Sequence, residues 1–256
     1  MSAKREERPV HLPTPIKGWR VFSGEVGIIV LGVLLALAAE QVVGWLHGRL
    51  VATDTRAATS DELNDGLASM MLRRQADDCI DRRLNELRAI LTTWQRTGTF
   101  KTPSWVSQTP VIEVALTRYD AAQSAGQLAL LPSEEQFRIG AVAEGVRRFQ
   151  QIQMEERLSW GRLRALQFGA SALSEADRSV LRAALQDAST WDYEARINSS
   201  EVLPMAKEYG FSPDYRRAKA IAGRVWSSGQ YTPSICTSID TPAAQANRTL
   251  VIPLPL

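Results

Sequence analysis

An uncharged apolar run near the N-terminus limits the folds open to this chain more than any other feature. Residues 26–39 read VGIIVLGVLLALAA and contain no charged side chain. Glu40 and Gln41 interrupt the run, and apolar residues then continue to Leu46. A helix that crosses a membrane needs about 20 predominantly apolar residues. We therefore expect a transmembrane helix over residues 23–46.

The charges on either side of the run predict its orientation. Residues 1–22 carry a formal charge of +3, from five basic and two acidic residues: Lys4, Arg5, Arg8, Lys17 and Arg20 against Glu6 and Glu7. On the other side, Arg49 stands alone. Lysine and arginine gather on the cytoplasmic side of membrane proteins, and tryptophans such as Trp19 and Trp45 mark the interfaces. The N-terminal tail is thus expected in the cytoplasm, and the chain from about residue 47 outside it.

Two other interpretations compete with a retained anchor. The first is a cleaved signal peptide, because Ala36-Leu37-Ala38 fits the small-x-small cleavage pattern behind an apolar core. The long leading region, the charge of Glu25 beside the core and the apolar residues after the cleavage point speak against it. The second is a buried helix of a soluble protein, which seldom lacks a polar face over so many residues.

One side of the expected transmembrane helix is small and acidic. Glu25 and Glu40 are 15 positions apart, which is about 22 Å along a helix and about 60° around it. Gly32, Ala36 and Ala39 project into the same sector. Small residues let helices approach closely, and charges inside a bilayer usually face protein or water. This face either docks on another transmembrane helix, from a second copy or a partner, or simply places its two acidic residues in the two headgroup layers.

After residue 47 the pattern predicts helices joined by short turns. Apolar residues recur at spacings of three and four, except where four charged residues interrupt the first stripe: Arg73, Arg74, Asp77 and Asp78. Four helices are expected, from Thr59 to Thr97, from Pro110 to about Ala125, from Ser133 to about Phe168 and from Ser174 to Tyr209, with a short fifth over residues 214–225.

Capping residues define most of these ends. The Ser/Thr-x-x-acidic-or-Gln signature of a capping box occurs at the start of three helices: Thr59 with Glu62, Ser133 with Gln136, and Ser174 with Asp177. Gly98 and Gly210 follow two expected helix ends, where glycine supplies a left-handed residue.

The expected fold class is mainly α. One N-terminal transmembrane helix leads into an antiparallel helical bundle over residues 47–225, because amphipathic helices with short connections pack in this way. Residues 226–256 are rich in Ser, Gly, Thr and Pro and are expected to form a loop-rich tail that packs on the bundle. Their apolar end, TLVIPLPL, is alternatively a free C-terminus that a protease or a PDZ-type groove recognises.

Cys79 and Cys236 are the two cysteines of the chain. Both fall in the part expected outside the cytoplasm, where an oxidising compartment permits a disulfide. A bridge between them would join the loop-rich tail to the first long helix. The alternative is two unrelated thiols, with Cys79 as a small apolar contact.

The residues present argue against most catalytic, cofactor and metal chemistry. The two histidines, His11 and His47, precede residue 48, so the region after it lacks the base of a Ser-His-Asp site and the ligands of most zinc and haem sites. No phosphate-binding or dinucleotide-binding glycine motif occurs. Carboxylate pairs are expected on solvated helix surfaces: Asp77 and Asp78, Glu134 and Glu135, Glu155 and Glu156.

We therefore expect no enzyme, no cofactor and no metal site. A net charge of +2 gives no reason to expect nucleic-acid binding. The expected partners are the lipid bilayer and a transmembrane helix of a second copy or of another protein. One function that fits is an interaction or structural module. The alternative is an envelope ligand sensor or regulator that works through a partner protein, because residues 1–22 are too few to fold into an output domain.

Three stretches of the sequence resemble uncharacterised single-pass proteins of Gram-negative bacteria. They are GEVGIIVLGVLLALAAEQVVGWLHGR (residues 24–49), CIDRRLNELRAIL (79–91) and GQLALLPSEE (126–135). In those proteins a similar apolar run ending in Ala-Glu-Gln leads into a helical exported domain. The resemblance implies an inner-membrane anchor and a periplasmic domain, and it implies no activity.

Overall fold

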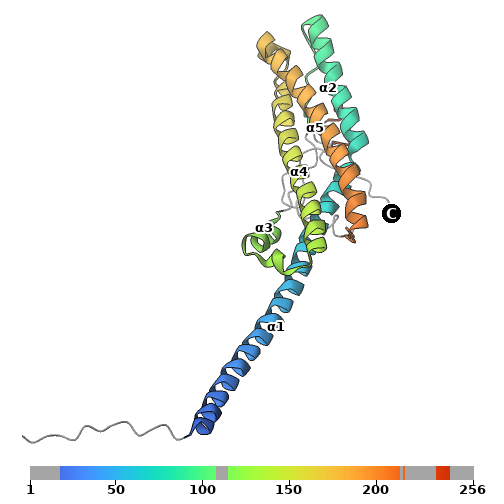
Figure 1. Ribbon diagram of the computed structural model, residues 1–256. Coiled ribbons are helices and arrows are strands. Elements are labelled where there is room, and N and C mark those ends of the chain that lie inside the picture. The colour runs from blue at the N-terminus through green and yellow to red at the C-terminus, as the bar shows by residue number, and fades with distance from the viewer. Residues whose placement is uncertain (1–17, 108–114, 214–215, 217–234, 243–256) are drawn as a thin grey trace, which may run out of the picture. The chain divides into compact units, whose positions relative to one another are not determined.

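The described elements of this chain are all helices (Figure 1). The computed structural model describes residues 18–107, 115–213, 216 and 235–242. Within these ranges, five α-helices and three short 3-10 helices follow one another: α1 (Trp19–Arg74), α2 (Asp77–Thr97), α3 (Thr117–Ser124), η1 (Gln127–Leu130), α4 (Ser133–Leu163), η2 (Arg164–Phe168), η3 (Ala170–Ala172) and α5 (Glu175–Glu208). The mainly α fold class is confirmed. The chain divides into two units, residues 1–51 and residues 52–256.

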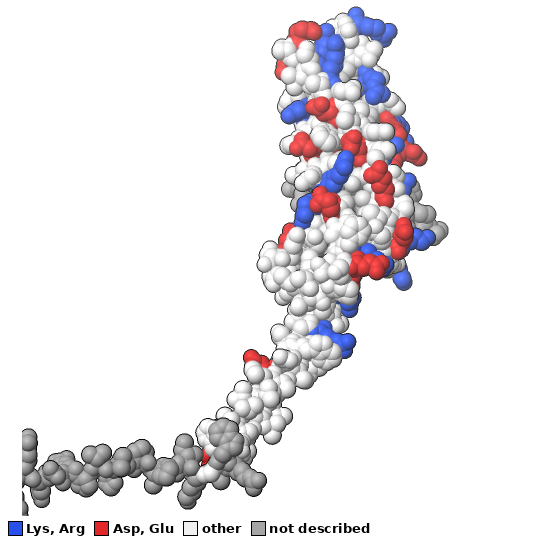
Figure 2. Space-filling model, in the orientation of Figure 1, with Lys and Arg blue, Asp and Glu red and all other residues white. Residues whose placement is uncertain are grey.

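The first unit contains the part of α1 that holds the apolar run. Its large apolar side chains are exposed, with Ile28 74 %, Val43 66 % and Leu50 67 % accessible. Figure 2 shows this stretch as almost free of charged side chains. Apolar surface of this extent is not left in water by a soluble monomer. The helix is long and apolar enough to cross a membrane, which is compatible with a single-pass membrane protein.

The helix continues past the apolar run, and the capping box predicted at Thr59 and Glu62 is wrong. Thr59 lies buried inside α1, and its hydroxyl donates to the carbonyl oxygen of Thr55 at 2.7 Å. No helix starts here. The backbone N–H groups that would donate to a capping side chain instead donate to carbonyl oxygens one turn earlier in α1. Glu62 caps another helix instead. Its carboxylate accepts the N–H groups of Arg118 and Tyr119, at 3.0 and 2.9 Å, at the start of α3.

A break at Gln75 and Ala76 divides the helix that was expected to run unbroken to Thr97. α1 ends at Arg74, and α2 begins at Asp77. The end of α2 is as predicted, because Gly98 takes a left-handed conformation with φ 73°. The break coincides with the charged residues that interrupt the apolar stripe.

Contacts with α5 and the segment after it lie on both sides of the break. Asn64 on α1 accepts the N–H of Ser212, just after α5, at 3.1 Å. Asp81 on α2 pairs with Arg196 on α5 at 2.7 Å. From the first contact to the second, the residue number rises by 17 along α1 and α2 and falls by 16 from the segment after α5 into α5. The last part of α1 and all of α2 behave as one rod that is antiparallel to α5.

The second unit is a bundle of three such rods, of which Figure 1 shows α2, α5 and α4 side by side. Contacts between exposed side chains show that α4 and α5 are antiparallel. Arg148 pairs with Glu194 at 3.4 Å, and Arg162 pairs with Asp187 at 3.5 Å. As the residue number rises along α4, it falls along α5. The bundle expected from the sequence is present.

Two glycines let the rods approach closely. A Cβ atom on Gly66 of α1 would lie 2.5 Å from Cγ1 of Val146 on α4. A Cβ atom on Gly145 of α4 would lie 2.6 Å from Cγ2 of Val202 on α5. Cβ atoms do not approach other atoms so closely, so both positions need a residue without a side chain.

The starts of α4 and α5 test the other two capping boxes. At α4 the prediction is wrong, since Pro132 takes the cap position and Ser133 is the first helical residue. The Gln136 side chain instead donates to a backbone carbonyl before the helix, at 2.7 Å. At α5 the capping box is confirmed. The Ser174 hydroxyl accepts the N–H of Asp177 at 3.2 Å, and the Asp177 carboxylate accepts the N–H of Ser174 at 2.8 Å.

The other predicted ends are met where the structure describes them. α4 ends at Leu163, and η2 continues the winding to Phe168. α5 is followed by Gly210 with φ 87°, as the sequence indicates. α3 is the described part of the second predicted helix, whose expected start at Pro110 lies outside the described residues. The fifth predicted helix, apart from residue 216, and the apolar end of the tail lie outside them too.

The predicted disulfide is present. Cys79 on α2 is bonded to Cys236, with Cα atoms 4.7 Å apart across 157 residues of sequence. The bond fastens the described part of the C-terminal tail, residues 235–242, to α2. Ile235 and Ile239 in this segment are 3 % and 8 % exposed and join the apolar cluster of the bundle. The segment is therefore packed as well as covalently tied.

A buried arginine reinforces the same attachment. Arg83 on α2 is 0 % exposed, and its guanidinium lies 4.2 Å from the ring centroid of Trp105. It donates to the carbonyl oxygens of Val106, at 2.8 Å, and of Thr237. The indole N–H of Trp105 donates to the carbonyl oxygen of Thr241 at 2.9 Å. Arg83 thus joins α2, the loop after it and the C-terminal segment.

Candidate functional site

A layer of buried charge divides the core of the second unit. Two apolar clusters lie in the bundle, and on α1, α4 and α5 charged residues fall between them. Near the end of α1, for example, Met70 belongs to one cluster, Ala76 to the other, and Arg73 lies between. Six arginine and aspartate or glutamate side chains from α1, α2, α4 and α5 form what we call the charged layer, with Asp81 at its exposed edge: Arg73, Asp77, Asp81, Glu156, Asp192 and Arg196.

Arg73 is the centre of the charged layer. Its residue is 1 % exposed, and Nη2 donates to Glu156 at 2.9 Å and to Asp192 at 2.5 Å. Nη1 donates to Asp77 at 2.9 Å. Burial opposes the charge of this guanidinium, but the attraction of Glu156 and Asp192 outweighs it and raises the pKa of Arg73 above its usual value. Arg73 therefore remains protonated inside the core.

Arg196 holds the other edge of the layer. Its Nη2 lies 2.8 Å from Asp192 and 2.7 Å from Asp81, and it donates to the backbone carbonyl of Asp77 at 3.0 Å. Burial raises the pKa of the Asp77 carboxyl even though Arg73 and Arg196 lower it. Each carboxylate of the layer lies against a guanidinium, so the layer joins α1, α2, α4 and α5 through ion pairs.

The sequence signals part of this layer. The charges that interrupt the first apolar stripe include Arg73 and Asp77, and the structure buries Arg73 and half-buries Asp77. The expectation that carboxylate pairs lie on solvated surfaces holds for Asp78 and Glu155, which are exposed, but is wrong for Glu156, which is 0 % exposed. Glu156 faces inward because it lies seven residues after the buried Phe149 on α4, which is about two helical turns.

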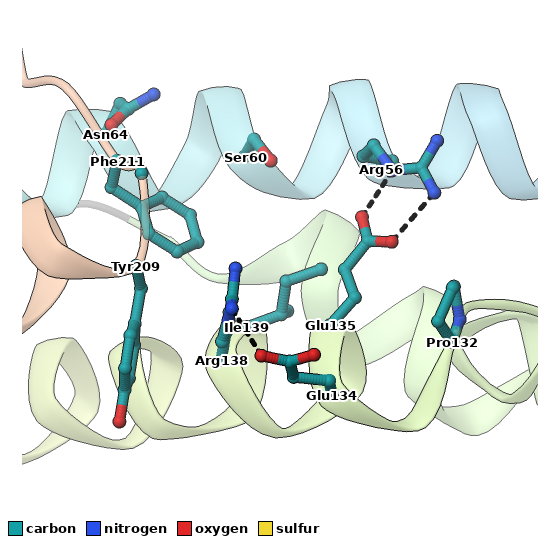
Figure 3. A pocket seen from close by; sticks show the side chains of 11 residues that line it. Arg56, Ser60, Asn64, Pro132, Glu134, Glu135, Arg138, Ile139, Tyr209 and Phe211 are labelled. Carbon is teal, nitrogen blue, oxygen red and sulfur yellow. Dashed lines mark hydrogen bonds and ion pairs between the residues drawn. The ribbon is translucent and has the colours of Figure 1, made fainter.

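A pocket of 310 Å³ lies where α1, α4 and the end of α5 meet (Figure 3). We call it the α1–α4 pocket. Its lining comes from three stretches: Arg56, Ser60 and Asn64 of α1; Pro132, Glu134, Glu135, Arg138 and Ile139 at the start of α4; and Tyr209, Gly210 and Phe211 after α5. Its volume falls at the small end of the range for ligand pockets. The sequence did not single out this site, because its residues converge only through the packing of three segments.

Two ion pairs stand in the α1–α4 pocket. In Figure 3 the guanidinium of Arg56 faces the carboxylate of Glu135, and Nη2 donates to Oε2 at 2.7 Å. These hydrogen bonds lower the pKa of the Glu135 carboxyl and raise that of Arg56. Arg138 pairs with Glu134 one turn away on α4. The pocket therefore carries two positive and two negative groups beside an apolar wall.

Two further hollows are described. One is a polar groove between α2 and α5, made of adjoining parts of 210 and 250 Å³ that share Arg88 and Ser189. The other, of 530 Å³, lies beside the loop after α2 and the tail residues Ile239 and Asp240. The lining of the groove includes Tyr193 and the ion pairs of Arg196 with Asp81 and Asp192, which belong to the charged layer. The lining of the other hollow includes Phe100 and the exposed pair of Lys101 and Asp240.

The candidate intramembrane face lies on α1, where Glu25, Gly32, Ala36, Ala39 and Glu40 are all exposed. A Cβ atom on Gly32 would meet no atom within 4 Å. Whether this face docks on another helix stays a prediction. Among the described residues, no group of three or more histidine, cysteine or carboxylate side chains has the geometry to hold a metal ion.

Comparison with known protein families, with characterised proteins and with solved structures finds no match to this chain.

Proposed function

We propose that this protein is a single-pass protein of a bacterial inner membrane. α1 is its anchor, residues 1–22 lie in the cytoplasm, and the helical second unit is a periplasmic interaction or structural module without catalytic activity. The observation that carries the proposal is the exposed apolar stretch of α1, of which 0 % is buried within the protein. Only a lipid phase or other apolar partners can cover such a surface.

The disulfide supports the periplasmic placement of the second unit. Disulfides persist in oxidising compartments and are rare in the cytosol. The bond between Cys79 and Cys236 joins two parts of the second unit. The basic residues before the apolar run support the same orientation through the positive-inside rule.

Membrane extraction and protease access test this proposal. The full chain would be expressed in a Gram-negative host with a C-terminal tag, and its membranes would be washed with alkaline carbonate. We expect a full-length protein that stays with the membrane and loses its tag when spheroplasts are treated with protease. A shorter, soluble periplasmic product would mean that α1 is cleaved after Ala38, and a protected tag would mean that the orientation is reversed.

We further propose that the small acidic face of α1 contacts a partner helix. Glu25 and Glu40 would then lie against protein rather than lipid, where charge is tolerated. Glu25→Ala combined with Glu40→Gln should lower the abundance of the protein or change the proteins that co-purify with it in mild detergent. If neither changes, the two residues only mark the ends of the span. Val30→Ala, on the aliphatic part of the same helix, is the matched control.

A second candidate function is a ligand sensor or regulator of the cell envelope. The α1–α4 pocket favours it, because a concave site with an apolar wall and a few charged groups is the common form of a small-molecule site. The pocket draws on α1 itself, through Arg56, Ser60 and Asn64. Such a sensor would act through another protein. A small molecule that raises the melting temperature of the full chain would support it over a purely structural module.

A further inference from the structure

We propose that the α1–α4 pocket binds a small zwitterion: a free α-amino acid with an apolar side chain. The inference rests on the second candidate function, the ligand sensor, and names the chemical class of its ligand. It is carried by the pairing of opposite charges in the pocket, by the apolar wall beside them and by the volume of 310 Å³.

The charges of the pocket favour a ligand that carries both signs. Arg56 and Glu135 face each other from α1 and α4, and Arg138 and Glu134 pair on α4. A ligand with a single charge would have to take one partner of a pair and leave the other without a counter-charge. A zwitterion offers a counter-charge to both partners at once, because its carboxylate meets the guanidinium and its ammonium meets the carboxylate.

The charged groups remain accessible to such a ligand. The side chains of Arg56, Arg138 and Glu134 are 46 %, 43 % and 76 % exposed. Arg56 directs two of its five guanidinium N–H groups to Glu135. The fork therefore has donors left for a second carboxylate, and arginine binds carboxylates through two parallel hydrogen bonds.

The other wall of the pocket is apolar. Ile139 and Phe211 are buried, and Tyr209 is half-buried. The ring of Tyr209 also packs edge-on against Phe137, with centroids 6.3 Å apart. Asn64 holds this wall in place, because its side-chain oxygen accepts the N–H of Ser212 next to Phe211 at 3.1 Å. An aliphatic or aromatic ligand side chain fits against this wall, while the main-chain charges of the amino acid face the ion pairs.

The test compares three probes that share the leucine side chain and differ in which main-chain charge they carry. Isothermal titration calorimetry on the full chain in detergent micelles would use L-leucine, which has both charges, L-leucinamide, which lacks the carboxylate, and N-acetyl-L-leucine, which lacks the ammonium. We expect L-leucine to bind. Each analogue should bind at least about tenfold more weakly, because one charge-assisted hydrogen bond is worth at least that factor. L-phenylalanine should bind in the same way.

Two variants assign the binding to this pocket. Arg56→Gln and Glu135→Gln should each weaken L-leucine binding about tenfold or more. Arg147→Gln is the matched control: Arg147 also pairs with a carboxylate of another helix, Asp120, at 2.6 Å, but lies outside the pocket. Circular dichroism of each variant would show that the helices are intact, so a loss of binding reports on the pocket.

Three results would overturn the inference. If N-acetyl-L-leucine binds as tightly as L-leucine, the pocket is an anion site, and if L-leucinamide does so, it is a cation site. If neither L-leucine nor L-phenylalanine binds at millimolar concentration, the pocket takes no amino acid of this class. None of these results bears on the anchored periplasmic module, because carbonate extraction and protease access decide that proposal independently.

Discussion

Arg73 and Glu156, 83 residues apart in sequence, form an ion pair of 2.9 Å in which neither side chain is more than 2 % exposed. The pair joins α1 to α4 in the middle of the core, between two apolar clusters. If the helices slid past one another, apolar contacts could re-form in a new position, but this ion pair would be broken. Buried polar groups in helical bundles are best attested as devices that fix register. We infer that the charged layer has this role here.

Removing the central arginine tests how much the charged layer contributes to the free energy of unfolding. Arg73→Met should lower the free energy of unfolding by about 3–5 kcal/mol, because the fully buried Glu156 then loses the guanidinium that faces it and Asp192 keeps only Arg196. Urea unfolding of the full chain in detergent, followed by circular dichroism, measures the change. The exposed pair of Arg162 and Asp187 provides the control, and Arg162→Gln should cost less than about 1 kcal/mol. Equal losses in the two variants would contradict a special role for the layer.

The charged layer also predicts a pH dependence. Burial raises the pKa of Asp77 above its usual 3.8, so the folded protein keeps a proton that the unfolded chain releases. This group therefore contributes stability below pH 3.8 that is lost as the pH rises through the raised pKa. Asp77→Asn removes the titration, so the stability of the variant relative to the wild type should increase as the pH rises through that window. Melting temperatures across the acid range measure this difference, and a constant difference would be inconsistent with a raised pKa.

Two glycines of α4 should respond in opposite directions to the same change. Gly145→Ala should destabilise by about 1–3 kcal/mol, because the new Cβ would lie 2.6 Å from Val202 in a packed core. Gly140→Ala should stabilise by about 0.5–1 kcal/mol, because its Cβ would meet no atom closer than 3.9 Å and alanine favours the helix. Chemical unfolding of the two variants measures both effects. A stabilised Gly145→Ala would show that α4 and α5 are less tightly packed than the structure has them.

The disulfide should contribute substantially to stability. Closing a loop of 157 residues restricts the unfolded chain, and the expected loss on removing such a bond is about 2–5 kcal/mol. The double variant Cys79→Ser with Cys236→Ser should therefore melt earlier than the wild type. Treating the wild type with a reductant should lower its melting temperature to that of the variant, while the variant itself should not respond. A variant that melts like the wild type would show that Arg83 and the buried isoleucines hold the segment unaided.

Several elements could be predicted from local sequence signals. The apolar run identifies the exposed part of α1, Ser174 and Asp177 form the expected capping box, and Gly98 and Gly210 follow the helix ends as predicted. Each of these depends on residues within one or two turns. The pairing of Cys79 with Cys236 was accessible for another reason, since the chain has no other cysteine.

The features that the sequence did not reveal depend on distant residues. The signature at Thr59 and Glu62 fits a capping box, but the helix already runs through it, and Glu62 bonds instead to N–H groups 56 and 57 residues later. Glu156 looks like one half of a solvated pair until α1 and α5 bring arginine and aspartate against it. The α1–α4 pocket has no contiguous motif at all, because its lining is set by how α1, α4 and the segment after α5 converge.

The link between Cys79 and Cys236 also changes what a cut in the chain would do. The loop after α2 contains exposed residues such as Lys101 and Thr102, where a protease can enter. A nick there lies between the two bonded cysteines, so both fragments stay covalently attached. On a non-reducing gel the nicked protein would still run as one chain, and only reduction would separate it. Cleavage within this loop would thus leave both fragments of the second unit tethered to α1.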